Sequence, residues 1–309
     1  MGLYQISGLT VASEVSLPGA LPLSSCSQNV DIRIGLTSEL HVLEKPSREG
    51  PLWALDSERF LFGLPGIGSF LAADGQYLEL APEGGCDTAL DALMPFALGT
   101  GIGALLHQRG CLALHASAVA DGSGRAIAIC ATSGMGKSTL AATLCRAGCK
   151  FLCDEITRIE FDGAGHPVIW ADSQLLKLSK KTIKYFSLEH SVLGCVRKGT
   201  SKQYVNPPNG TQGGPVPLSA IYVLCKPKLS DRVDIKALSL IDTAQQLLNH
   251  TYRRSLVLAM AELRPSQQAT FAANIIRHVP VFLLEWPDNL NQLEHHTNKL
   301  LAHWQSQMR

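Results

Sequence analysis

The sequence predicts an α/β protein with a core built on a mixed β-sheet flanked by helices, preceded by a small β-rich N-terminal domain. Two patterns indicate this fold class. Up to about Pro82, proline or glycine interrupts the chain every few residues, between short runs typical of strands. From Cys111 onward, short apolar runs of strand length alternate with segments typical of helices. The composition is sufficient for a packed core, because 46% of the 309 residues are hydrophobic and 17% are charged.

The N-terminal domain is expected to cover residues 1–86. The glycine-rich stretch Ala81–Cys86 (APEGGC) is a plausible junction, so a second domain would cover residues 87–309. The strands expected in the first domain are Leu3–Ile6, Val30–Gly35, Phe60–Leu64, Gly68–Ala72 and Tyr77–Leu80.

The second domain opens with Asp87–Gln108, which is mostly apolar and is expected to be a buried or interdomain helix. Cys111–Val119 is expected to form a strand or a pair of strands. Ala126–Ala131 is predicted to be a buried strand and Lys137–Cys145 a helix, separated by a turn of small residues. A short apolar strand, Lys150–Cys153, follows directly.

The rest of the chain continues this alternation. Strands are expected at Ile156–Phe161, Val168–Trp170, Ala220–Cys225, Val233–Ala237 and Val281–Leu284, and helices at Ser179–Phe186, Leu240–Tyr252, Gln267–Arg277 and Asn289–His303. Between them, Lys198–Gly214 is long, polar and rich in glycine. This segment is interpreted either as a substrate lid or as a disordered connection.

Charge and composition bound the partners and the location. The net charge of +1 gives no bulk electrostatic reason to expect nucleic acid or an anionic membrane as partner. The weakly charged stretches Ala92–Ala113 and Ala126–Leu144 are interrupted by glycines and polar groups, so neither is expected to span a membrane. The amino terminus has no basic region followed by a compact apolar run, so a cytoplasmic location is expected. The nine cysteines include no C-x-x-C pair, which favours reduced core residues over a metal site, and the oligomeric state stays open.

The segment AIAICATSGMGKS, residues 126–138, carries the most specific motif. It matches the P-loop, or Walker A, pattern G-x-x-x-x-G-K-[ST] except that Ala131 takes the place of the first glycine. The backbone amides of such a turn and the positive end of the following helix bind phosphate. Lys137 can reach the β and γ phosphates of a nucleotide, and the Ser138 hydroxyl can ligate Mg²⁺. The residues expected to bind nucleotide are Ser133, Gly134, Met135, Gly136, Lys137, Ser138 and Thr139.

An acidic pair, Asp154 and Glu155, follows the next predicted strand. Ligands of an α/β sheet gather beyond the carboxyl ends of its strands, and both the loop and this pair are expected there. We assign Asp154 as the general base or hydroxyl-orienting group and Glu155 as a magnesium ligand, directly or through water, although the two roles could be exchanged. His115 ends an apolar strand before the loop and could hydrogen-bond Asp154 or the transferring phosphate.

The segments LHASAVA, ATSGMGKSTLAATL and GCKFLCDE together resemble the catalytic core of the HPr kinase/phosphorylase family, which carries a histidine before a G-x-S-G-x-G-K-S loop and an acidic pair after it. The opening YQISGLTVASEVSLPGALPL and the later PVPLSAIYVL more closely resemble the HPr-kinase-like proteins of peptide-maturation clusters, notably lasso-peptide kinases. The chain departs from the family at Ala131, which replaces a glycine, and at Glu155, which replaces an aspartate.

The resemblance implies a P-loop kinase that uses ATP and Mg²⁺ and phosphorylates a serine hydroxyl of a peptide or small protein. For the lasso-peptide relatives, the implied acceptor is the terminal serine of a precursor peptide. By the same resemblance, Ser133–Thr139 bind the nucleotide phosphates, Ser138 holds magnesium, and Asp154 with His115 handles the acceptor. The cations that could supplement Lys137 are Lys177, Lys198, Lys202, Arg253 and Arg254.

Two alternatives remain. The protein could be a kinase for a small metabolite, with the first domain in a structural role. It could also be a nucleotide-binding regulatory ATPase without an acceptor, in which Asp154 would polarise water.

Overall fold

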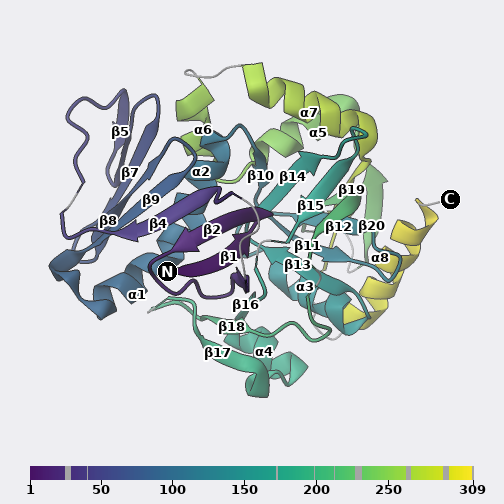
Figure 1. Ribbon diagram of the computed structural model, residues 1–309. Helices are drawn as coiled ribbons and strands as arrows, with labels where there is room; N and C mark the ends of the chain where they lie inside the picture. The colour runs from purple at the N-terminus through teal and green to yellow at the C-terminus, as the bar shows by residue number, and fades with distance from the viewer. Residues whose placement is uncertain are drawn as a thin grey trace. The chain divides into compact units, whose positions relative to one another are not determined.

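The computed structural model describes residues 1–24, 29–39, 41–171, 173–197, 199–211, 213–226, 232–261, 266–287 and 292–307 (Figure 1). These residues form two compact units, one from Met1–Ala113 and Tyr252–Gln268, the other from Leu114–Thr251 and Ala269–Arg309. The predicted fold class is confirmed: a β-rich region comes first, and a mixed sheet with flanking helices follows.

The first unit is built on a sheet in which nine strands of its described residues pair in the order β3-β1-β2-β4-β9-β8-β7-β6-β5. The strands expected in this region are all present, and β2, β3, β5 and β6 are additional. The buried side chains of Ile32, Ile34, Phe70 and Leu78 line one face of the sheet. The strands are β1 (Gly2–Ile6), β2 (Leu9–Ser13), β3 (Leu21–Pro22), β4 (Ile32–Leu36), β5 (Arg48–Gly50), β6 (Trp53–Leu55), β7 (Arg59–Leu64), β8 (Gly68–Ala73) and β9 (Tyr77–Pro82).

Helices cover this sheet through buried apolar side chains. The helical segments of the unit are η1 (Glu83–Gly85), α1 (Asp87–Phe96), the π-helical η2 (Ala97–Gly101), α2 (Ile102–Gln108) and α6 (Arg254–Ala261). Both α1 and α2 pack on β8 and β9, and Leu93 and Leu105 have no exposed surface. The approach is close at Gly101, where a Cβ atom would lie 3.0 Å from Cδ1 of Leu78, so a methyl group there would require the Leu78 side chain to shift.

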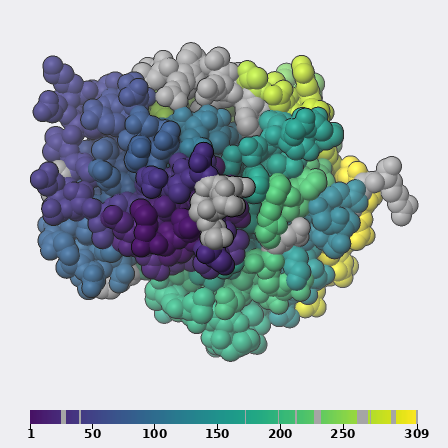
Figure 2. Space-filling model, viewed as in Figure 1, coloured from purple at the N-terminus to yellow at the C-terminus, as the bar shows by residue number. Residues whose placement is uncertain are grey.

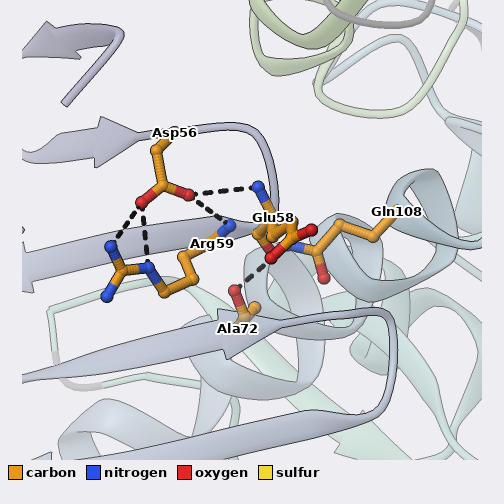
Figure 3. Close-up of polar contacts among 5 residues, drawn as sticks. All are labelled: Asp56, Glu58, Arg59, Ala72 and Gln108. Atoms are coloured by element: carbon orange, nitrogen blue, oxygen red, sulfur yellow. Dashed lines mark hydrogen bonds and ion pairs between the residues drawn. The ribbon is translucent and has the colours of Figure 1, made fainter.

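The Gln108 carboxamide fastens the end of α2 to the sheet (Figure 3). Its Nε2 donates to the carbonyl oxygens of Glu58, at 2.9 Å, and Ala72, at 3.1 Å. Its Oε1 accepts from the backbone N–H of Gly75 at 2.9 Å. Gln108 is 6% exposed, so these bonds satisfy a polar group whose unpaired burial would be costly.

The helical stretch Asp87–Gln108 is, among the described residues, long and apolar enough to cross a membrane by length and composition, with 22 residues and a mean hydropathy of 1.6. In this structure, 67% of the tested window is buried inside the protein. An apolar core helix meets the same criterion, and this burial is what packing on β8 and β9 requires.

The second unit contains a mixed sheet whose described strands pair in the order β14-β15-β19-β12-β11-β13, with β21 beside β19 and β20 beside β21. The pairs β12 with β19 and β19 with β21 are parallel, whereas β11 is antiparallel to both of its neighbours. The strands from this part of the chain are β10 (Leu112–Leu114), β11 (Ala116–Ala120), β12 (Ala126–Cys130), β13 (Lys150–Asp154), β14 (Thr157–Phe161), β15 (Pro167–Trp170), β19 (Pro215–Cys225), β20 (Asp234–Ala237) and β21 (Val281–Glu285).

Helices α3 (Lys137–Arg146) and α8 (Leu293–Ser306) pack against each other, and α3 also packs on β11, β12 and β13 (Figure 1). Leu140, Leu144, Leu300 and Trp304 belong to one core cluster with the sheet, and each is at most 1% exposed. Helices α5 (Leu240–Asn249) and α7 (Ser266–His278) follow later in the chain. The predicted helices are thus present, although residues 289–291 lie outside the described part, and α6 is additional.

A small substructure lies between β15 and β19 in the chain. It has a three-stranded sheet, in the order β16-β18-β17, and the helices α4 (Lys180–Phe186) and η3 (Glu189–Ser191). The strands are β16 (Leu176–Ser179), β17 (Val192–Cys195) and β18 (Lys202–Val205). In Figure 2, atoms in the teal to green colours of this segment form part of the molecular surface.

The expected loop Lys198–Gly214 is therefore wrong over Lys202–Val205, which form β18; residues 198 and 212 lie outside the described part. Pairing on both sides, with β16 and β17, stabilises a strand whose polar sequence KQYV carries a weak signal of its own.

The compact units do not divide at residue 86, since the first unit also contains the helices from Asp87 to Gln108 and the segment that starts at Tyr252. The division into domains 1–86 and 87–309 concerns units of sequence and stays a prediction.

Candidate active site

The candidate site lies where three strands of the second unit meet at one edge of the sheet. Because β11 runs antiparallel to both β12 and β13, the carboxyl ends of β12 and β13 lie beside the amino end of β11. The register places Ser117 of β11 opposite Ile129 of β12 and opposite Asp154 of β13. The loop that follows β12 and the acidic pair that ends β13 are thereby brought together, as the sequence predicts.

The loop between β12 and α3 has two glycines in the left-handed region, at positions that belong to the motif. Gly134 and Gly136 have φ angles of 85° and 96°, which a residue with a Cβ adopts only under strain. Apart from the adjoining residues of the chain, no atom of the described residues lies within 4 Å of the position of a Cβ on either glycine, so the backbone conformation and not the available space demands glycine. Ala131 is fully buried and has no positive φ, which explains why alanine replaces the first glycine of the motif.

Lys137 begins α3 and is 7% exposed. Its Nζ donates to the carbonyl oxygen of Ala131 at 2.8 Å, so the ammonium group lies across the loop. Burial lowers the pKa of Lys137 from its ordinary value, and the negative charge of Asp154 opposes this shift. A largely buried ammonium group therefore lies inside the loop.

The Asp154 carboxylate accepts three hydrogen bonds, and the residue is 3% exposed. Its Oδ1 accepts from the hydroxyls of Ser117, at 2.6 Å, and Ser138, at 2.9 Å. Its Oδ2 accepts from the backbone N–H of Lys177 at 3.0 Å. A carboxylate has about four acceptor positions, so the donors of the described residues leave one, on Oδ2.

Glu155 lies beside this carboxylate but has a different partner. Its Oε2 forms an ion pair with Nζ of Lys177, which faces Tyr204 across the β16–β18 pair. Burial alone would lower the pKa of Lys177, but Glu155, Tyr204 and Asp154 together raise it above its ordinary value. Glu155 also has a φ of 115°, which is strained for a residue with a side chain and typical of functional positions.

His115 lies at the same edge of the sheet, and its backbone N–H donates to the backbone carbonyl oxygen of His250 at 2.7 Å. Burial, followed by the nearby charge of Lys137, lowers the pKa of His115 to about 4. Burial and Lys137 also lower the pKa of His250 to about 4. Both imidazoles are therefore neutral at pH 7, and either can exchange hydrogen bonds without carrying a charge.

The side-chain oxygens at this edge of the sheet are suitable ligands for a magnesium ion. The described residues contain no group of three or more His, Cys, Asp or Glu side chains that could hold a metal. Mg²⁺ needs fewer protein ligands, because it prefers oxygen and takes several ligands from phosphate and water. The Ser138 hydroxyl and the Asp154 carboxylate, 2.9 Å apart at the loop, are such an oxygen pair.

The other predicted loop residues lie as follows. Ser133 is exposed, Met135 packs against the core cluster, and the Thr139 hydroxyl lies 3.2 Å from that of Thr182 in α4.

The predicted additional cations have different positions. Lys177 lies in the site, and Lys202 is near enough to Lys137 to lower its pKa. Arg253 and Arg254 belong to the first unit, and Lys198 lies outside the described residues.

Four residues of the site escape the sequence reasoning: Ser117, Thr182, Tyr204 and His250. Only Ser117 had a readable signal, because it follows His115 by two residues, and alternate side chains of a strand lie on the same face.

Neither a protein-family model nor a curated protein sequence matches this chain. Among solved structures, the chain is similar to the HPr(Ser) kinase/phosphatase from Coxiella burnetii, with 12% sequence identity and a TM-score of 0.35. The similarity covers 63% of this chain and 97% of that one. A likeness at this identity and TM-score does not transfer an activity from one protein to the other.

Proposed function

We propose that this protein is an ATP-dependent kinase that phosphorylates a serine hydroxyl of a peptide or small protein. The second unit would bind ATP through residues 133–139. Two features support the proposal: the P-loop geometry, and the resemblance of three sequence segments to the HPr kinase/phosphorylase family.

The observation that carries the proposal is the contact between the Ser138 and Asp154 side chains, 2.9 Å apart, beside the buried Lys137. A hydroxyl at the start of the loop helix and a carboxylate from another strand end are the pair that P-loop enzymes use to hold magnesium. Asp154 makes this contact with Ser138, whereas Glu155 pairs with Lys177. We therefore propose that Asp154 contributes to the magnesium site through Oδ1 and keeps its expected role toward the acceptor hydroxyl through Oδ2.

In the proposed reaction, the loop amides and Lys137 hold the triphosphate, and the acceptor hydroxyl approaches its terminal phosphorus. The acceptor oxygen forms a bond to phosphorus while the bond to the leaving ADP oxygen breaks. The hydroxyl proton passes to the open acceptor position on Oδ2 of Asp154. Bound Mg²⁺, held by Ser138 and Asp154, would supply charge neutralisation of the phosphates. Neutral His115 would orient the acceptor through a hydrogen bond.

For the acceptor, we propose the C-terminal serine of a lasso-peptide precursor, on the strength of the sequence segments at the amino terminus and at PVPLSAIYVL. ATP is available in the cytoplasm, which is the location that we propose for the protein.

The test is phosphate transfer from radiolabelled ATP, with Mg²⁺, to pools of serine-containing peptides and, in parallel, to pools of metabolites. Lys137→Ala and Ser138→Ala should abolish transfer. Asp154→Asn should lower kcat by roughly 10²-fold to 10⁴-fold, while the affinity for ATP, measured by calorimetry, stays largely unchanged. His115→Ala should slow transfer less severely.

Matched controls are Lys236→Ala and Asp162→Asn, which change residues exposed at the surface of the second unit. A single-turnover rate for Asp154→Asn equal to that of the parent would refute its role. Transfer to metabolites alone, or release of phosphate without any acceptor, would assign the site to one of the two alternative functions. Absence of ATP binding would reject all three.

A further inference from the structure

The small substructure with β16, β17, β18 and α4, whose Lys177 N–H donates to Asp154, carries an excess of positive charge. Over residues 173–197 and 199–205, its described part contains five lysines and one arginine, but only one acidic residue, Glu189. The whole chain is nearly neutral, with 27 basic and 26 acidic residues. Four of the lysines are exposed, and none of them forms an ion pair with the part of the chain that the structure describes. We call them the basic surface: Lys180, Lys181 and Lys184 of α4, and Lys202 of β18.

The basic surface adjoins the phosphate loop through a chain of short contacts. The Thr182 hydroxyl of α4 lies 3.2 Å from the Thr139 hydroxyl in the first turn of α3. Lys202 pairs in register with Ser179, the residue that caps α4, and the N–H of Lys180 donates to the Ser201 carbonyl oxygen at 3.2 Å. Helix α4 therefore adjoins the loop through its buried face, its lysines lie on the exposed side of the same helix, and Lys202 is near enough to Lys137 to lower the pKa of Lys137.

Four like charges in one place repel one another, and that repulsion is relieved when a partner of opposite charge binds. The nucleotide does not require them, because the loop already provides Lys137 and backbone amides. Helix α4 has seven residues and is about 10 Å long, which matches about three residues of an extended chain. Double-stranded nucleic acid would demand a longer basic track over the protein.

We propose that the basic surface binds acidic residues of the acceptor, placed within a few residues of the hydroxyl that is phosphorylated. The partner is an acidic peptide segment. This inference rests on the proposed function for the identity of the acceptor, but the binding itself can be measured without any transfer.

The experiment uses the full chain and two synthetic peptides that share one serine, one flanked by Asp and Glu, the other by Asn and Gln. The double variant Lys181→Glu, Lys184→Glu should raise KM for the acidic peptide on the order of tenfold, with kcat changed less than about twofold. Its KM for the amide peptide should change little. The charge-matched control is Lys45→Glu, Lys299→Glu, at exposed positions outside this substructure. A fluorescent acidic peptide with alanine in place of the serine reports binding alone, by anisotropy, and should dissociate as salt increases.

Equal affinity of the acidic peptide for the parent and the double variant overturns the inference. So does binding of single-stranded RNA or of phosphatidylserine vesicles that depends on Lys181 and Lys184 while the acidic peptide does not bind. If the acidic peptide binds through these lysines but no peptide is phosphorylated, the inference stands and the proposed kinase function fails.

Discussion

Ser117 shows how much of the site depends on a buried side chain that no catalytic motif names. The residue is fully buried, and its hydroxyl donates to Oδ1 of Asp154 at 2.6 Å, beside the bond from Ser138. A hydrogen bond to a charged group contributes about 1.5–3 kcal/mol, more than one between neutral groups. Ser117 is therefore expected to be a positioning residue: it fixes the carboxylate through Oδ1 and leaves one acceptor position open on Oδ2.

We predict that Ser117→Ala lowers kcat by about tenfold and leaves KM for ATP within about twofold, because the carboxylate loses one of its restraints and the loop is untouched. Steady-state kinetics with an acceptor peptide measure both constants. Ser123→Ala, in an exposed turn, is the matched control. A purely structural role would instead lower the free energy of unfolding without separating kcat from KM.

At the scale of residues, the sequence predicts those site residues that are neighbours along the chain. Lys137, Ser138 and the two glycines are given by one local motif, and the structure has the backbone that the motif requires. The contacts of Asp154 with Ser117 and with the N–H of Lys177 depend on strand register and on the return of the chain after 23 residues or more. Neither property is encoded in a local pattern.

At the scale of elements, the turn between β12 and α3 is a strained segment supported by buried neighbours on both sides. All residues of β12 are buried, and most of α3 packs into the core. Such a frame holds Gly136 in its left-handed conformation at the start of the helix, where the backbone amides converge.

We predict that Gly136→Ala weakens ATP binding by roughly tenfold or more while the fold persists. A Cβ at this φ costs about 1 kcal/mol, and a shift of the loop that relieves this strain would displace its backbone amides. Gly124→Ala is the matched control: its φ is also positive, at 75°, its Cβ would likewise meet open space, and it lies in a turn outside the site. Calorimetry of ATP binding and thermal unfolding of both variants separate the two effects. Equal loss of ATP affinity in both variants would contradict the prediction.

The elements that the sequence predicts correctly are those with a strong apolar pattern, such as β12, β13 and α3. The strands β16, β17 and β18 were not expected, because their residues are partly polar and their stability comes from pairing with one another. For the same reason, a segment interpreted as a lid or a disordered connection contains a central strand.

At the scale of the whole molecule, three histidines that are half-buried or buried tie stability to pH. Burial is the largest cause that lowers the pKa of His107, His115 and His250, each to about 4. The ordinary value in the unfolded chain is about 6.5. Between these values the unfolded chain binds more protons than the native protein, so the free energy of unfolding rises with pH and is lost as the pH falls from about 6.5 to about 4.

We predict that each histidine contributes up to about 1.4 kcal/mol per pH unit to this slope. His107→Gln, which retains a donor for the Tyr252 carbonyl oxygen, should reduce the slope by about one proton. Urea unfolding at several pH values between about 4.5 and 7 measures it, with His295→Gln, at an exposed position, as control. An unchanged slope in His107→Gln would contradict the prediction.

The division of the chain between the compact units is the feature of the whole molecule that the sequence could least predict. Tyr252 joins the first unit: its N–H donates to the Ala113 carbonyl oxygen at 2.7 Å, and its own carbonyl oxygen lies 2.8 Å from Nε2 of His107. These partners are separated by well over a hundred residues, and Gly103 is needed because a Cβ there would lie 2.7 Å from the Tyr252 ring. Periodicity and turn signals report only neighbours along the chain.

The position of β11 between β12 and β13 also has a consequence for synthesis on the ribosome. Both of its partners, β12 and β13, come later in the chain, so its second edge stays open until Asp154 has left the exit tunnel. At about 5–20 residues per second, that delay lasts a few seconds. During this interval the nascent chain presents an apolar strand with one unpaired edge. A chaperone that binds such an edge would therefore act in these few seconds.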